Sequence, residues 1–347
     1  MSQAAAASPI QNDKDLDEAL SRPIDADVEA MGSLEGDILF LGVSGKMGPT
    51  MASLAKRASE AAGVKRKIIG AARFSAPGSR ESLEALGVET VYCDLLDRAS
   101  VDALPDAKNV MFMAGQKFGT SSNQSVTWAN NAYAPAIAAE RFKDSRIVAF
   151  STGNVYPLTP VASGGPTEKD PVGPIGEYAQ SALGRERIFE YFSQKNGTPA
   201  AIIRLNYAVE LRYGVLRDVA DRVAKGEPID IAMGYANVIW QRDANSIALR
   251  AFGHTASPPF VLNMTGADTI SIREVAEKFG ELLGKKPVYN GTESDTALLN
   301  NAALCKEMFG PATATVDEVI GWIAAWISGG GRALGKPTHF EQRDGNF

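Results

Sequence analysis

Three glycines spaced three residues apart stand in the run Gly42-Val43-Ser44-Gly45-Lys46-Met47-Gly48. The run follows an apolar segment at residues 38–41 and opens a helix-like segment at residues 49–58. A strand, a glycine turn and a helix N-terminus bind phosphate groups, because the turn lets the backbone approach a pyrophosphate and the helix offers unpaired N–H groups. In another setting, three glycines would indicate only a flexible loop. Here they predict a nucleotide-binding turn made by Gly42, Gly45, Lys46, Met47 and Gly48.

Arg73 follows the next strand-like segment, residues 67–72, and bears on which nucleotide binds. NAD enzymes commonly place a carboxylate near this point to bind the ribose 2′-hydroxyl, and that carboxylate would repel a 2′-phosphate. This chain has Ala72 there, while Arg73, Ser75 and Arg80 supply donors, and arginine pairs strongly with phosphate. We therefore expect NADP as the favoured cofactor without excluding NAD. The alternative for Arg73 is a solvated loop charge.

Strand-like and helix-like segments alternate from residue 38 onward, and these elements must position the candidate groups. Strands are predicted at residues 38–41, 67–72, 89–93, 109–113, 146–150, 200–204 and 260–264, and helices at 49–58, 128–142, 178–194, 272–283 and 316–327. This alternation predicts an α/β fold with a doubly wound parallel sheet of the Rossmann type. Ligands of such sheets bind at the carboxyl ends of the strands.

The alternation also suggests how the chain divides. Residues 1–36 are expected to form an N-terminal extension with a short helix at 27–31, and residues 37–206 the dinucleotide-binding Rossmann domain. After residue 206 the alternation loosens, so residues 207–347 are predicted to form mainly a smaller substrate-binding region. The late strand and helix, residues 260–285, should return to the Rossmann domain.

Composition excludes several classes of function. The 347-residue chain has a net charge of −6, whereas nucleic-acid binding needs a basic surface. No apolar run is long enough to cross a bilayer, and the first 30 residues lack the basic-then-apolar order of a signal peptide. With only Cys93 and Cys305, no disulfide framework or zinc pattern is present, and we expect no metal. We predict a cytoplasmic enzyme without a nucleic-acid or membrane partner, which could form a homodimer.

Further segments, in the right order along the chain, resemble the extended short-chain dehydrogenase/reductases, also called the NAD-dependent epimerase/dehydratase family. The resemblance covers roughly residues 37–328. The glycine turn matches the family's GxxGxxG, and the other matching segments are Cys93-Asp94-Leu95, Met113-Ala114-Gly115-Gln116-Lys117, Asn131, Ser151-Thr152-Gly153-Asn154-Val155-Tyr156, Tyr178-Ala179-Gln180-Ser181, Asn263-Met264-Thr265-Gly266 and Thr269-Ile270-Ser271-Ile272-Arg273-Glu274.

The resemblance implies a role for individual residues. Tyr178 would be the catalytic acid/base, and Thr152 would hold the substrate oxygen where hydride is transferred. Cofactor contacts would come from Asp94, Leu95, Ala114, Gly115, Lys117 and Tyr178, and substrate contacts from Asn154 and Asn206. Without the resemblance, Tyr178 could be a core aromatic and Thr152 could merely end a strand.

One departure from the family pattern concerns the lysine of its YxxxK motif, because Ala182 stands there. In the family this lysine lowers the pKa of the tyrosine, which is about 10 when free. Losing three pKa units of activation would cost about 4 kcal/mol. Lys117 or Arg185 could supply the missing cation. We favour Lys117, because helix rise places Arg185 roughly 10 Å along the axis from Tyr178.

Trp240-Gln241-Arg242-Asp243 stands where the family has an HVDD-like motif of its substrate region, and only Asp243 matches. We expect Trp240 and Arg242 to bind substrate, with a core position as the alternative for Trp240. His254 and His339 are the only histidines. His339, in a Gly-rich tail, is the more suggestive of the two.

The function that these observations favour is that of an NAD(P)-dependent oxidoreductase or epimerase. It would act on a sugar or nucleotide sugar by hydride transfer at a carbinol or ketone carbon. The alternative is a nucleotide-binding regulatory protein with little catalysis, which Ala182 supports and the retention of both Thr152 and Tyr178 opposes.

Overall fold

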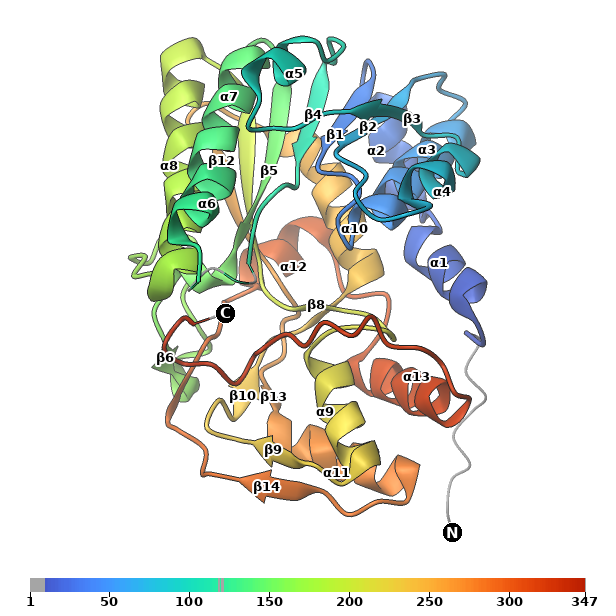
Figure 1. Ribbon diagram of the computed structural model, residues 1–347, viewed down its shortest axis with the longest axis vertical. Coiled ribbons are helices and arrows are strands. Elements are labelled where there is room, and N and C mark those ends of the chain that lie inside the picture. Colours follow the sequence, from blue (N-terminus) through green and yellow to red (C-terminus); the bar gives the residue numbers. More distant parts are fainter. Residues whose placement is uncertain (1–9, 118, 120–121, 347) are drawn as a thin grey trace.

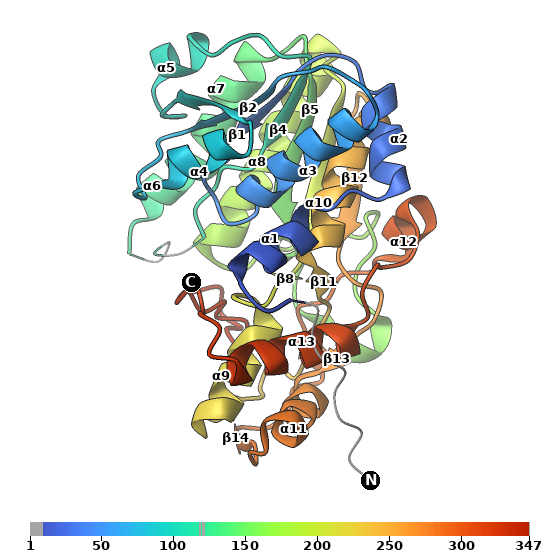
Figure 2. The same ribbon diagram turned by 90° about the vertical axis from the view of Figure 1, so that its right-hand side faces the viewer.

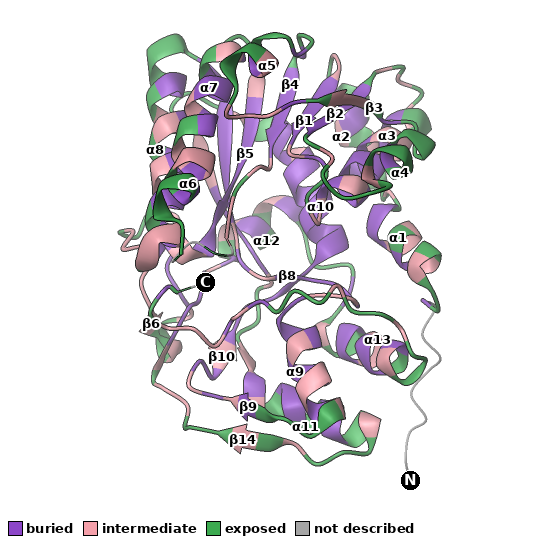
Figure 3. Cartoon of the chain, viewed as in Figure 1, coloured by how far each residue is buried: buried purple, intermediate pink, exposed green. Residues whose placement is uncertain are grey.

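Seven parallel strands form the central sheet in the computed structural model, which describes residues 10–117, 119 and 122–346 (Figure 1). Their order across the sheet is β3-β2-β1-β4-β5-β7-β12. The strands are β1 (Ile38–Leu41), β2 (Ile68–Ala72), β3 (Glu89–Tyr92), β4 (Asn109–Phe112), β5 (Arg146–Thr152), β7 (Ala200–Leu205) and β12 (Phe260–Met264). The central strands are buried along most of their length (Figure 3). This is why they appear in the sequence as continuous apolar runs.

Helices cover both faces of the sheet, as a doubly wound fold requires (Figure 1). One face packs against α2 (Asp25–Ser33), α3 (Gly48–Ala61), α10 (Gln241–Arg250) and α12 (Ala303–Phe309), and the other against α5 (Arg98–Asp102), α7 (Ala134–Arg141) and α8 (Gly176–Asn196). Helix α4 (Ser79–Ala85) packs against β3 and buries Leu83 on the first of these faces, and α6 (Gln124–Trp128) packs against α8. The predicted Rossmann-type α/β fold is therefore confirmed.

A second apolar core lies below the sheet, between α9 (Val215–Lys225), α11 (Ile272–Leu283) and α13 (Val316–Ser328). The expected return of residues 260–285 to the Rossmann domain is correct only for the strand, since β12 pairs with β7. Helix α11 instead packs against α9 and α13, because its apolar face buries Ile272, Val275, Ala276 and Phe279 in this lower core. The predicted boundary near residue 206 stays a prediction.

Short two-stranded sheets connect chain segments outside the central sheet. They are β8 (Ala208–Val209) with β11 (Ile239–Trp240), β9 (Pro228–Asp230) with β14 (Val288–Asn290), β10 (Tyr235–Ala236) with β13 (Ile270–Ser271), and β6 (Thr159–Pro160) with β15 (Thr296–Ala297). Within the described ranges, no helix is long and apolar enough to span a membrane.

The N-terminal segment is integrated into the fold, which corrects the expectation of an appended extension. Helix α1 (Asp13–Ser21) lies between α3 and the lower core (Figure 2), where Leu16 and Leu20 are fully buried. Helix α2 packs on α3 through Met31. These apolar side chains at helical spacing are what attach the segment to both cores.

The C-terminal tail runs back from α13 across the lower part to the start of α8 (Figure 1). Thr338 donates from its backbone N–H and its hydroxyl to Asp218, at 2.7 and 2.5 Å. Arg343 donates to the carbonyl oxygen of Thr296 at 2.8 Å, and the ring of Phe340 is buried. The tail is therefore fixed in place and forms one wall of the site described next.

Candidate functional site

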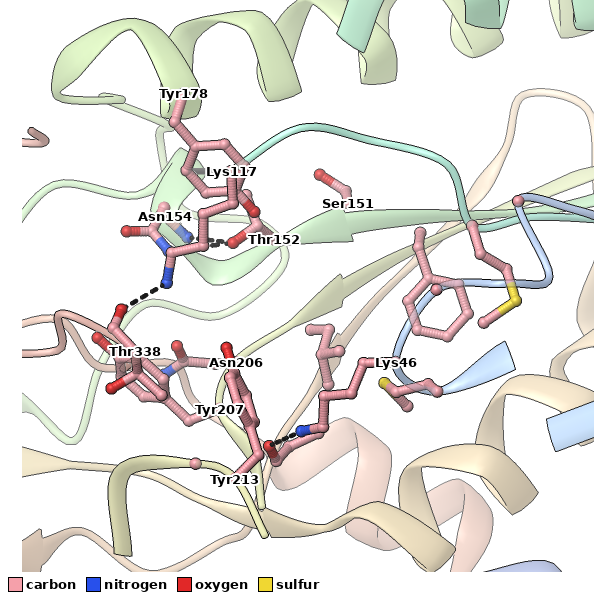
Figure 4. Close-up of a pocket in the computed structure, with 18 residues that line it drawn as sticks. Lys46, Lys117, Ser151, Thr152, Asn154, Tyr178, Asn206, Tyr207, Tyr213 and Thr338 are labelled. Carbon is pink, nitrogen blue, oxygen red and sulfur yellow. Dashed lines mark hydrogen bonds between the residues drawn. The ribbon is translucent and has the colours of Figure 1, made fainter. Parts of the chain in front are cut away.

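A pocket of about 260 Å³ opens at the carboxyl ends of β1, β4, β5 and β7 (Figure 4). The sequence-predicted residues that line it are Gly42, Gly45, Lys46, Met47, Lys117, Thr152, Asn154, Tyr178 and Asn206. The structure thus brings the glycine turn and the predicted catalytic pair into one cavity. This is the place where ligands bind in open parallel sheets.

The glycine turn has the geometry of a phosphate cradle. Gly42 has a φ of 89°, and a Cβ there would lie 2.9 Å from the backbone of Ala114. A Cβ at Gly48 would clash with the carbonyl group of Val43, so this glycine lets α3 begin tightly against the turn. Gly45 is exposed, and a Cβ there would meet only its own loop, at 3.3 Å from the Gly42 oxygen. The space beside Gly45 therefore fits a ligand phosphate at the start of α3.

Asn131 fixes the loop that follows β4. It lies in the π-helical turn η1 (Ala129–Tyr133), a type of irregularity that is frequent at functional sites. Its side chain accepts from the Gln116 N–H at 2.8 Å and donates to the Gln116 oxygen at 2.9 Å. It also donates to Ser181 and accepts from Arg185, at 2.9 and 2.7 Å. One buried side chain thereby joins this loop to α8.

The hydroxyl of Thr152 stands at the end of β5 and accepts two hydrogen bonds from Asn154. The donors are the backbone N–H at 3.2 Å and the side-chain amide at 3.1 Å. A threonine hydroxyl has two acceptor sites and one O–H, so the O–H of Thr152 is left to donate to a substrate oxygen. Tyr178, in the first turn of α8, points toward Thr152 (Figure 4).

Ala182 cannot take over the role expected of the family lysine. Its methyl group is buried in a small apolar cluster with Val155 and Tyr156. Arg185, one turn further along α8, is buried and donates to the Phe150 oxygen at 2.8 Å and to Asn131. Burial lowers the pKa of Arg185, and the nearby Tyr178 acts in the opposite direction. The hydrogen bonds of Arg185 therefore hold its guanidinium between Asn131 and the end of β5, near enough to Tyr178 for the two groups to interact electrostatically.

Two lysines line the pocket, and desolvation acts on both. Lys117 donates to the Thr338 oxygen at 3.1 Å, and burial lowers its pKa to about 8. Lys46 donates to the Ala208 oxygen at 3.3 Å and lies 3.6 Å from the ring centroid of Tyr213. Burial lowers the pKa of Lys46 to about 7. A cation inside such a pocket is stabilised by any anion that enters it.

Residues that the sequence did not single out complete the pocket wall. Tyr207 and Tyr213 follow β7, and burial raises the pKa of both hydroxyl groups. Thr338 comes from the C-terminal tail, far away in sequence. In the sequence, only the neighbouring His339 pointed to this segment. Other lining residues are Met113, Phe150, Ser151, Leu205, Ala208 and Gly214.

Two expected substrate-binding residues lie elsewhere, and these assignments are corrected. Trp240 is buried and stacks edge-on against Trp322, with ring centroids 5.5 Å apart, so the core alternative is the right one. The guanidinium of Arg242 is buried against the carboxylate of Asp27, at 2.6 Å. Both positions face the N-terminal helices or the lower core because β11 and α10 turn their side chains away from the pocket.

The remaining candidates lie around the pocket. Arg73 is exposed at the end of β2, and Asp94 follows β3 and accepts from the Leu96 N–H at 3.0 Å. Leu95 is half-buried next to Asp94. Gly115 and Lys117 border a second groove of about 1260 Å³ that also includes Gly45. Ala114 contacts the glycine turn beside it. Among the described residues, no group of three His, Cys, Asp or Glu side chains could hold a metal ion.

Fold and pocket together define a Rossmann-type nucleotide-binding protein with a threonine–tyrosine pair. The chain belongs to the NAD dependent epimerase/dehydratase family, whose model matches residues 38–254. Membership confirms the predicted class of NAD-dependent, epimerase-like enzyme. No curated protein matches the chain.

Solved structures similar to this chain share its fold at low sequence identity. MoeE5 in complex with UDP-glucose and NAD is 18% identical, with a TM-score of 0.66 over 84% of this chain and 98% of that one. UDP-glucose 4-epimerase from Thermotoga maritima is 16% identical, with a TM-score of 0.66 over the same shares. UDP-glucuronic acid 4-epimerase from Bacillus cereus in complex with NAD is 15% identical, with a TM-score of 0.69, again over 84% and 98%.

Proposed function

We propose that the protein is an NAD(P)-dependent oxidoreductase or epimerase that acts on a sugar or nucleotide sugar. The observation that carries the proposal is that one pocket is lined by both the glycine turn and the Thr152–Tyr178 pair. A protein that only sensed a nucleotide would need the turn but not the pair. Relatives in fold are described as bound to NAD and to UDP-sugars, which supports the same class of ligand.

Thr152 and Tyr178 divide the work on the substrate hydroxyl. The O–H of Thr152 donates to the substrate oxygen and so fixes its position against Tyr178. Tyr178, as phenolate, accepts the proton of that hydroxyl while the carbinol carbon is oxidised, and returns a proton in the reverse direction. A bound nicotinamide supplies the hydride acceptor or donor. Asn154 and Asn206 would hold further substrate hydroxyls.

Lys117 is our proposed source of the positive charge that favours the phenolate of Tyr178. It lines the same pocket, where it donates to the Thr338 oxygen, and the carboxylates of Asp218 and Glu341 favour its charged form. Arg185 is the second candidate, since its guanidinium lies behind the pocket wall and is electrostatically coupled to Tyr178. In either case the positive charge would favour the phenolate form during the reaction.

The cofactor would lie across the glycine turn, with Gly42, Gly45, Lys46, Met47 and Gly48 at its phosphates. The groove between Gly45 and Gly115 continues this path. Adenine would meet Asp94 and Leu95 at the end of β3. We further propose a preference for NADP, supported by Arg73, which is exposed at the end of β2 and has no hydrogen bond or ion pair within the described part of the chain.

The preference for NADP is tested by calorimetric titration with both dinucleotides. NADP should bind at least about tenfold more tightly than NAD, because an arginine–phosphate pair contributes about 1.5–3 kcal/mol. Arg73→Ala should remove most of that difference, while Arg187→Ala, an exposed arginine on α8, should not. Tighter binding of NAD by the unmodified protein would reverse the assignment.

The proposed class itself is tested by identifying any nucleotide released from the denatured, purified protein, together with its redox state. Tightly held NAD would favour an epimerase, in which the cofactor is regenerated in each cycle. Exchangeable NADP would favour a dehydrogenase or reductase. Absence of binding to either dinucleotide would reject the function.

We also propose a cytoplasmic location, because Cys93 and Cys305 are buried free thiols. A homodimer remains our prediction for the assembly.

A further inference from the structure

We infer that the substrate is an acidic monosaccharide, whose carboxylate or phosphate is bound by the side chain of Lys46, rather than a neutral sugar or a nucleoside diphosphate sugar. The inference rests on the function proposed above and specifies its substrate class.

The charge of the pocket is the first argument. Lys46 and Lys117 line it, and among its described lining residues there is no carboxylate. Lys46 contacts a carbonyl oxygen and an aromatic ring, and the carboxylates of Glu210 and Asp218 favour its charged form without forming an ion pair with it in the described residues. A desolvated ammonium group without an anionic partner is costly. An anionic group on the substrate would remove this cost at the moment of binding.

The direction of the Lys46 side chain is the second argument. The backbone of the glycine turn faces the start of α3, where backbone N–H groups suit the cofactor phosphates. The Lys46 side chain leaves the turn on another side and crosses to Ala208 and Tyr213 (Figure 4). Both residues belong to the segment after β7, on the side of the pocket where Asn206 also lies. The ammonium group therefore lies on the side of the pocket where Asn206 lies, at the point where the pocket meets the larger groove that Lys46 also borders.

The size of the pocket is the third argument. Pockets for drug-sized ligands measure about 300–1,000 Å³, whereas this one measures about 260 Å³. Thr338 closes one side, and its two hydrogen bonds to Asp218 hold the tail there. The larger groove beside it contains Gly45 and Gly115, which belong to the path of the cofactor. The pocket itself also borders the cofactor through Gly42, Gly45 and Met47, so only the part near Thr152, Asn154 and Asn206 is left for the substrate. A single sugar ring suits that part better than a sugar joined to a nucleoside diphosphate.

The test is calorimetric titration of the protein loaded with its dinucleotide. The panel consists of hexuronates, aldonates and hexose phosphates, their neutral hexose counterparts, and UDP-hexoses. We expect at least one acidic monosaccharide to bind at least about tenfold more tightly than its neutral counterpart and than the UDP-sugars. Comparing carboxylates with phosphates distinguishes the two sources of the anion.

Lys46→Met should bring the acidic sugar to the affinity of its neutral counterpart, because it removes the ammonium group and keeps the backbone of the glycine turn. Lys65→Met, at an exposed position after the end of α3, should change the affinity neither for the sugar nor for the dinucleotide. The inference is overturned if no acidic monosaccharide binds preferentially, or if Lys46→Met weakens the dinucleotide and not the sugar. Failure of the proposed function shows separately, as absence of dinucleotide binding in the first titration.

Discussion

Tyr178 can accept a proton only as phenolate, and a free tyrosine has a pKa of about 10. Positive charge near its ring must therefore replace the lysine that we expect at the position of Ala182. Lys117 offers that charge inside the pocket, and Arg185 offers it from within the wall, where Asn131 and Phe150 hold the guanidinium. The two cations differ in that only the charge of Lys117 is expected to change near neutral pH.

The pH dependence of kcat/KM separates the two candidates. If Lys117 is the helper, removing its charge in Lys117→Met should raise the apparent pKa of the alkaline-rising limb of the profile and slow turnover at pH 7. Because the pKa of Lys117 is about 8, its help should fade above that pH, and the difference from the unmodified enzyme should shrink.

Arg185→Lys keeps a positive charge but loses the hydrogen bonds of the guanidinium to Asn131 and Phe150. If Arg185 is the helper, this change should shift the apparent pKa of the alkaline-rising limb of the kcat/KM profile. Arg187→Lys, at an exposed site on the same helix, is the matched control. An unchanged profile in Lys117→Met would eliminate Lys117 as the helper and leave Arg185 as the candidate.

At the scale of elements, strands β1 and β12 have the bounds that the sequence predicted, and the other five sheet strands differ by one or two residues at an end. A strand that is buried on both faces is a continuous run of apolar residues. Its bounds can therefore be predicted from the sequence without knowledge of the tertiary structure. Helix α10 was not predicted, since its polar side chains are buried by contacts from elsewhere in the chain. Arg242 meets Asp27 and Asn245 meets Thr50. Such long-range polar pairing is invisible in a local pattern, which is also why Arg242 was wrongly placed in the substrate site.

The junction of β1 and α3 gives an element-scale prediction. Gly45→Val should abolish dinucleotide binding while the sheet stays folded, because the new side chain would fill the phosphate space and its Cβ would meet only the Gly42 oxygen of the same loop, at 3.3 Å. Titration with the preferred dinucleotide, together with far-UV circular dichroism, measures both parts. Gly253→Val, at an exposed glycine with nothing within 4 Å of its Cβ position, is the control. Unchanged dinucleotide affinity in folded Gly45→Val would remove the turn from the cofactor site.

At the scale of the whole molecule, both ends of the described chain contribute to the arrangement around the pocket. Helices α1 and α2 join the two cores, and the tail after α13 brings Thr338 to the site. Neither contribution could be predicted from the sequence, since a Gly-rich tail and an acidic N-terminal segment resemble solvated extensions. Their contacts lie more than 200 positions apart along the chain, as in the pairs Asp27–Arg242 and Lys117–Thr338.

The buried pair of Asp27 and Arg242 should make the N-terminal segment essential for stability. Arg242→Met leaves the Asp27 carboxylate buried without its cation, which should lower the free energy of unfolding by about 3–5 kcal/mol. Arg187→Met, which breaks an exposed pair with Glu190, should cost no more than about 1 kcal/mol. Denaturant titration measures the free energy of unfolding of both variants. Adding Asp27→Leu to Arg242→Met removes the unpaired carboxylate and should restore part of the lost stability. Equal small losses in both single variants would show that the segment is held by apolar contacts alone.

The most direct test of the proposed chemistry is single-turnover formation of enzyme-bound reduced nicotinamide. It is followed by fluorescence after the dinucleotide-loaded protein is mixed with the sugar that binds it best. The unmodified protein should form reduced nicotinamide. Tyr178→Phe, which removes one hydroxyl group, should slow this step by at least about a hundredfold, since general acid–base catalysis contributes 10²–10⁴-fold, while dinucleotide affinity changes little. Full activity in Tyr178→Phe would contradict the account.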